Sequence, residues 1–215
     1  MTGLLEKDIR IILSRKQALY IFLLMGVVFG FTMGGEFIFG YLPFLFTILA
    51  ISTISYDEIN NGYSFLLTLP VDEKIYVQEK YVFCILAGIS SWILSIGIYL
   101  ISNVTKGTLM PIGELIPMFF CFLLMIFLFP SIMVPIQLKF GIERSRIVMT
   151  IIAGVFMVIP LILEKIVPKA SLISWIEKLD AVSPSAVFLV LVVVVCIAVT
   201  LSYLISVNIM KKKEY

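Results

Sequence analysis

Six long apolar runs, separated by short polar segments, account for most of this chain of 215 residues. A helix crosses the apolar core of a bilayer in about 20 residues, so each run can form one transmembrane helix. The pattern predicts an all-α membrane protein with six spans, at 17–33, 37–55, 81–102, 112–135, 147–163 and 186–210. We expect one transmembrane domain over 1–215, made of an interfacial helix (1–16), two spans (17–55), a cytoplasmic loop (56–80), three spans (81–163), an outer connection (164–184), a last span (185–210) and a cytoplasmic tail (211–215).

The first sixteen residues are too charged to span a membrane, but they carry an apolar stripe. Its members follow the spacing i, i+4, i+7, i+8 and are Leu5, Ile9, Ile12 and Leu13. Charged residues lie mostly on the opposite face, and Asp8 at the boundary is the one imperfection. We expect an amphipathic helix on the inner membrane surface, with a frayed tail as the alternative.

Three glycines at four-residue spacing, Gly26, Gly30 and Gly34, lie in and just after the first span. On a helix they share one face, where a second backbone can approach closely. They predict a helix contact, either between two copies of the chain or within one chain.

Two further features concern the middle of the chain. Pro130 and Pro135 near the end of the fourth span predict a bend, because proline frees backbone carbonyls of the helix. The basic segment 137–146 is expected to be a loop before the fifth span.

The long connection 164–184 contains a second amphipathic pattern. Its apolar positions repeat at i, i+3, i+4, i+7 and are Leu172, Trp175, Ile176 and Leu179. This spacing predicts a short outer helix on the membrane surface, with the tryptophan at headgroup depth.

Basic residues are distributed unevenly between the two ends of the predicted spans. Twelve of the 16 lie in 1–16, 56–80, 137–146 and the C-terminal tail. The positive-inside rule therefore places both termini and the 56–80 loop in the cytoplasm of a multi-pass cell-membrane protein.

Composition excludes several kinds of chemistry. Hydrophobic residues make up 61% of the chain, only 14% are charged, and there is no histidine, which excludes histidine-based catalysis and imidazole metal sites. No phosphate-binding loop motif occurs, and the acidic residues of the spans lie at their ends, at Glu36, Glu114 and Glu164. We expect that energy for transport comes from another subunit, because ion-coupled carriers usually keep charges near the midplane.

The polar segment 55–80 differs from the other connections. Its ends hold five carboxylates, but positions 63–69 between them are mostly apolar. We expect a short helix from Glu58 to Thr68, ended by Pro70, and a second helix capped by Asp72 that continues into the third span.

The order Tyr56-Asp57-Glu58, then Tyr63, Phe65 and Leu66-Leu67-Thr68-Leu69-Pro70-Val71, then Lys80-Tyr81, resembles the first cytoplasmic loop of the bacterial ABC type-2 permease family. The six-span layout extends this resemblance over the whole chain, to a single permease domain. Asp72-Glu73 departs from the hydroxyl and basic residues that often follow the Leu-Pro-Val segment in that family.

The resemblance implies a permease subunit of an ATP-driven exporter. Its loop would carry a coupling helix that docks into a separate ATPase subunit, and the expected coupling residues are Asp57, Glu58, Tyr63, Phe65, Leu66, Leu67 and Pro70. Asp57 and Glu58 are expected as solvent-exposed charges at the rim of the docking groove, and Tyr63, Phe65 and Leu66 as apolar anchors outside the membrane bundle. The expected partners are two ATPase copies, a second permease chain, identical or related, and membrane lipid. No nucleic acid is expected as a partner.

The chain itself is expected to be no enzyme and to bind no cofactor or metal, since ATP and Mg²⁺ would bind in the partner. Similar permeases export amphipathic peptides such as phenol-soluble modulins or antimicrobial peptides, so an amphipathic or hydrophobic cargo is expected. The alternatives are a self-contained secondary transporter or channel and an intramembrane enzyme.

Overall fold

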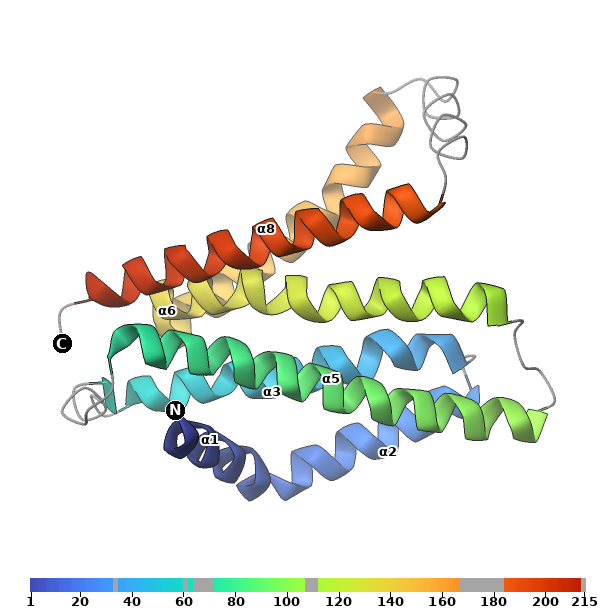
Figure 1. Cartoon of the computed structure of the whole chain (residues 1–215), viewed down its shortest axis with the longest axis horizontal. Coiled ribbons are helices and arrows are strands. Elements are labelled where there is room, and N and C mark those ends of the chain that lie inside the picture. Colours follow the sequence, from blue (N-terminus) through green and yellow to red (C-terminus); the bar gives the residue numbers. More distant parts are fainter. Residues whose placement is uncertain (33–34, 60–61, 64–71, 107–111, 167–183, 214–215) are drawn as a thin grey trace.

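A computed structural model describes residues 1–32, 35–59, 62–63, 72–106, 112–166 and 184–213 of the chain (Figure 1). All regular elements within these residues are helical, which confirms the predicted all-α class. They are α1 (Thr2–Ser14), α2 (Lys16–Thr32), the short 3₁₀ turn η1 (Gly35–Phe37), α3 (Ile38–Glu58), α5 (Glu73–Lys106), α6 (Ile112–Ile166) and α8 (Pro184–Lys211).

The helices form an elongated bundle built around α3 and α5, which pack along each other. The first part of α6 lies against α3 and α5, and α8 packs on α6 and α5 (Figure 1). One apolar cluster joins the end of α3 to the start of α5 and includes Ile54 and Val77. A second cluster, at the other end, contains Phe39 and Tyr99. The bundle therefore has an apolar interior at both ends.

Four helices of the described part are long and apolar enough to cross a membrane. They are α3, α5, Leu115–Gly141 of α6 and Ala186–Lys211 of α8, and a fifth is reached if α1 and α2, bent by 72° at their junction, count as one span. Helix α2 alone has 17 residues, about 25 Å of helix, which is short for a hydrocarbon core of about 30 Å. The chain is thus a multi-pass membrane protein, and the predicted count of six spans is not confirmed.

The segment 137–146, predicted as a loop, is instead helical on both sides of one residue. The backbone of α6 leaves helical geometry at Gly141, where φ is 69° and ψ is −170°. Positive φ is accessible to glycine because it has no Cβ, so this single residue can turn the chain. Figure 1 shows the later part of α6 running away from the earlier part. The backbone also stays helical through Pro130 and Pro135.

Gly26 and Gly30 bring α2 close to its neighbours in the same chain. A Cβ at Gly26 would lie 2.9 Å from a side-chain carbon of Leu42 in α3, and one at Gly30 would lie 3.0 Å from Ile98 in α5. The Ser102 hydroxyl donates a hydrogen bond of 2.7 Å to the carbonyl oxygen of Gly30. The two alternatives were a contact between copies and one within the chain, and this geometry gives a contact within the chain.

Three groups of predicted residues lie outside the described residues, and their roles stay predictions. They are Gly34, the apolar loop residues Phe65, Leu66, Leu67 and Pro70, and the outer-helix residues Leu172, Trp175, Ile176 and Leu179.

Candidate functional site

The two ends of the 56–80 loop meet helix α1 at one end of the bundle. Helix α3 ends at Glu58, and Ile59 is already extended, with φ −64° and ψ 138°. The helix predicted to begin at Glu58 therefore does not begin there, although Gly62 and Tyr63 are helical. Helix α5 begins at Glu73, where the carbonyl of Asp72 accepts the amide hydrogen bond of Tyr76. We call the five charged residues Lys7, Asp8, Asp57, Glu79 and Lys80, which meet at this point, the charge cluster.

Lys80 on α5 is the centre of the charge cluster. Its side chain has no exposed surface, and its ammonium group binds the carboxylate of Asp8 on α1. The same Nζ lies 2.7 Å from Oδ2 of Asp57 and 3.2 Å from the hydroxyl oxygen of Thr53, both on α3. One lysine thus links three helices that are far apart in the sequence.

Lys7 and two hydroxyl groups complete these contacts. The ammonium group of Lys7 binds Asp57 and lies 3.0 Å from Oδ1 of Asp8. The phenol of Tyr76 donates to Oδ2 of Asp57 at 3.0 Å, and the hydroxyl of Thr53 donates to Oδ2 of Asp8 at 2.8 Å. Buried charges are tolerated when they are paired and hydrogen-bonded, as Asp8, Asp57 and Lys80 are here.

Glu79 is the exception within the charge cluster. It has no exposed surface, and among the described residues neither of its carboxylate oxygens has a hydrogen-bond partner. Its nearest cation is the ammonium group of Lys80, 3.7 Å from Oε2. Three carboxylates therefore share two ammonium groups. Of the three, the charge of Glu79 is compensated least, because its one close cation is 3.7 Å away and it has no hydrogen bond.

The C-terminal segment contacts the loop from the other side. Nζ of Lys213 lies 3.6 Å from Oε1 of Glu58 and 4.4 Å from the centre of the Tyr63 ring. It also donates to the carbonyl oxygen of Leu138 at 3.4 Å, just before the turn at Gly141. A Cβ at Gly141 would lie 2.5 Å from the Glu58 carboxylate. Segments near both termini thus hold the start of the loop.

The structure corrects the expected exposure of two coupling residues. Asp57 was expected as a solvent-facing rim charge, but it is 6% exposed and is bound by Lys7, Lys80 and Tyr76. Tyr63 was expected outside the bundle, but it is 4% exposed and packs edge-on against Tyr76. These exposures were wrong because both residues have partners elsewhere in the chain. Their part in docking an ATPase stays a prediction.

Helix α1 forms where it was predicted, but its orientation differs in part. Leu5 and Ile12 of the stripe pack against the bundle core, while Ile9 and Leu13 are 48% and 55% exposed. The residue that faces the interior most completely is Asp8, which looked like an imperfection of the stripe. The sequence contains two signals of the charge cluster. They are the charge of Asp8 on the apolar side of α1 and the position of Lys80 directly before an apolar span.

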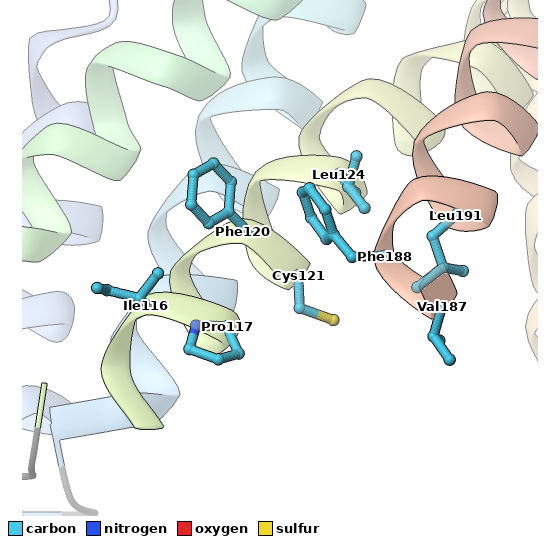
Figure 2. A pocket seen from close by; sticks show the side chains of 8 residues that line it. All are labelled: Ile116, Pro117, Phe120, Cys121, Leu124, Val187, Phe188 and Leu191. Carbon is cyan, nitrogen blue, oxygen red and sulfur yellow. The ribbon is translucent and has the colours of Figure 1, made fainter. Parts of the chain in front are cut away.

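An apolar pocket of about 390 Å³ lies between the starts of α6 and α8, at the end of the bundle away from the charge cluster. Figure 2 shows its lining, which contains Ile116, Pro117, Phe120, Cys121, Leu124, Val187, Phe188 and Leu191.

The described residues contain no group of three or more cysteine, aspartate or glutamate side chains arranged to hold a metal ion.

Long apolar helices with a buried charged end define a multi-pass membrane protein. The sequence model of the ABC-2 family transporter protein matches residues 3–211, nearly the whole chain, so the chain belongs to that family. It is a membrane permease component of an ABC transporter. Comparisons with curated proteins and with solved structures gave no significant match.

Proposed function

We propose that this chain is the transmembrane permease subunit of an ATP-driven exporter, and that its 56–80 loop receives mechanical work from a separate ATPase subunit. The family match over 3–211 is the observation that carries this proposal. Two ATPase copies would bind and hydrolyse ATP with Mg²⁺, and a second permease chain, identical or related, would complete the pathway.

The anchoring of the loop supports its role as the coupling element. Asp57 at one end and Lys80 at the other are joined within 2.7 Å, and both contact α1. A force on the loop would therefore act on three packed helices. The apolar loop residues Phe65, Leu66 and Leu67 are the proposed anchors on the ATPase, since a few large buried side chains usually dominate an interface.

The proposed orientation places both termini and the loop in the cytoplasm. Basic residues on the same side as the loop support this, because they favour the cytoplasmic side of a membrane. Ile9 and Leu13, which are exposed on α1, would then contact the inner leaflet, while Arg10 on the same helix is exposed to solvent and paired with Glu6.

The proposed cargo is an amphipathic peptide or another hydrophobic molecule. The apolar lining of the pocket between α6 and α8 is compatible with such a cargo. Helix α8 also presents many exposed apolar side chains, including Leu189, Val194 and Leu201, which are suited to contact lipid or a second permease chain.

One observation favours a second candidate, a self-contained secondary transporter. The charge cluster contains buried carboxylates and one buried lysine, Lys80, of the kind that move protons or ions in such proteins. It lies near the ends of the long helices α3 and α5, however, since Asp57 is one residue before the end of α3 and Lys80 is only eight positions into the 34-residue helix α5. We therefore prefer a mechanical role for the cluster.

The test is coexpression with a candidate ATPase, followed by copurification and measurement of ATP hydrolysis. The proposal predicts a stable complex whose hydrolysis rate changes when the permease is present. A Phe65→Ala, Leu66→Ala double variant should lose association or stimulation. Glu6→Gln, a surface change on α1, should behave as the unaltered chain does. Stimulation that is fully kept in the double variant would contradict the coupling role of the loop.

A further inference from the structure

Glu79 is a buried acid of the charge cluster that lacks a hydrogen bond. The large majority of buried polar side-chain atoms in proteins have hydrogen-bond partners, so an exception calls for a physical reason. Glu79 has no exposed surface, and neither oxygen accepts a hydrogen bond from a described residue. Leaving such a group buried destabilises the conformation in which it occurs.

The donors of Lys80 explain why Glu79 is left out. An ammonium group has three donors, and Nζ of Lys80 already faces three oxygens, on Asp8, Asp57 and Thr53. Glu79 is the next acceptor, with Oε2 at 3.7 Å. Lys80 can therefore bind Glu79 fully only when one of the three present partners moves away.

Asp57 is the partner best placed to leave. It lies one residue before the end of α3, where the coupling loop begins, and it has two further donors in Lys7 and Tyr76. Those donors would keep its charge compensated after separation from Lys80. Asp8 would also keep two donors, Lys7 at 3.0 Å and the Thr53 hydroxyl at 2.8 Å, but it lies in the middle of α1 and not next to the loop.

We infer that Glu79 is the alternate acceptor for Lys80, and that Lys80 passes from Asp57 to Glu79 when the ATPase pulls on the loop. This inference rests on the proposed function and deepens it by naming the residue on α5 that accepts Lys80 when Lys80 separates from Asp57 on α3. Two arrangements of one lysine between two carboxylates form a two-state element, which is what a force on the loop can bias. Burial of the Glu79 carboxylate without a hydrogen bond destabilises the resting arrangement and keeps the two states close in energy.

Glu79→Gln and Glu79→Met give the first test, and it needs no partner. Both changes remove a buried carboxylate that has no hydrogen bond, so the melting temperature of the purified chain in detergent should stay equal or rise by about 2–4 °C. Glu6→Gln is the matched control, a carboxylate with an exposed partner on α1. A clear loss of melting temperature in both Glu79 variants would overturn the inference, because Glu79 would then stabilise the resting state.

The second test follows the separation of α3 from α5. Spin labels at Ile59 and Gln78, both exposed, report the distance between the end of α3 and the start of α5. The exposed cysteines Cys121 and Cys196 are first replaced by serine. The distance is measured by pulsed electron resonance in the lipid-reconstituted complex, without nucleotide and after trapping with Mg-ADP and vanadate.

The unaltered chain should show a longer distance after trapping, and Glu79→Met should lose at least about half of that change. An unchanged distance in a complex that hydrolyses ATP, or a full change in Glu79→Met, would overturn the inference while leaving the proposed function intact. A chain that neither binds nor stimulates an ATPase would instead refute the proposed function, and the melting test would still decide whether Glu79 stabilises the resting state.

Discussion

Replacing Lys80 by methionine tests the charge cluster, because it removes the central cation and keeps a side chain of similar length. Nζ of Lys80 is fully buried and faces oxygens of Asp8, Asp57 and Thr53. The change would leave Asp8, Asp57 and Glu79 buried with Lys7 as the only cation of the cluster. Breaking a buried ion pair by removing one partner typically costs about 3–5 kcal/mol.

A loss of that size is a large part of the total stability of a domain, which is about 5–15 kcal/mol. The free energy of unfolding can be measured for Lys80→Met by titration with sodium dodecyl sulfate in mixed micelles. Arg10→Met is the control, since Arg10 forms an exposed pair with Glu6 and such pairs contribute less than about 1 kcal/mol.

A rescue variant separates the loss of the cation from the loss of packing. Adding Asp8→Asn and Asp57→Asn to Lys80→Met removes the carboxylates that were left unpaired, and should recover more than about half of the lost stability. If Lys80→Met is as stable as Arg10→Met, or if the added changes recover nothing, Lys80 does not occupy the centre of a buried charge cluster and the reasoning is refuted.

Two further predictions concern glycines and use glycines of the same chain as controls. Gly30→Leu should destabilise the fold by about 1–3 kcal/mol, because its Cβ would lie 3.0 Å from Ile98 and 3.3 Å from Ile38. Gly97→Leu is the control. A Cβ at Gly97 has no atom within 4 Å, so this change should be close to neutral in the same unfolding assay. Gly141→Ala should cost about 1–3 kcal/mol for its backbone conformation alone, and its Cβ would also meet Glu58. Gly154→Ala should be tolerated, because no atom lies within 4 Å of its Cβ. Equal thermal stability of the two alanine variants would show that residue 141 is not in this conformation.

The helices could be predicted from the sequence because local patterns specify them, but several ends could not. Hydropathy located the third span at 81–102, and Asp72 as a cap predicted the helix that precedes it, since α5 begins at Glu73. The segment 137–146, in contrast, was predicted as a loop because it is basic, but it is helical on both sides of Gly141. Polarity indicates exposure and not backbone conformation.

The charge cluster could not be predicted because its contacts join distant parts of the sequence. Asp8 and Lys80 are separated by 72 positions, and Lys7 and Asp57 by 50. A helical projection of 1–16 identifies Asp8 as out of place but contains no information on its partner. Asp57 belonged to the motif by which the loop resembles a permease family, yet only the packed structure shows that its carboxylate faces the interior.

The most direct test of the central claim measures transport in proteoliposomes that contain the permease, with or without its ATPase subunit. A fluorescent amphipathic peptide serves as the probe, and its movement is followed with Mg-ATP, with a non-hydrolysable ATP analogue, or with an imposed ion gradient. The account predicts movement only when the ATPase subunit and hydrolysable ATP are both present. Movement driven by the ion gradient through the permease alone would contradict it and would identify a secondary transporter.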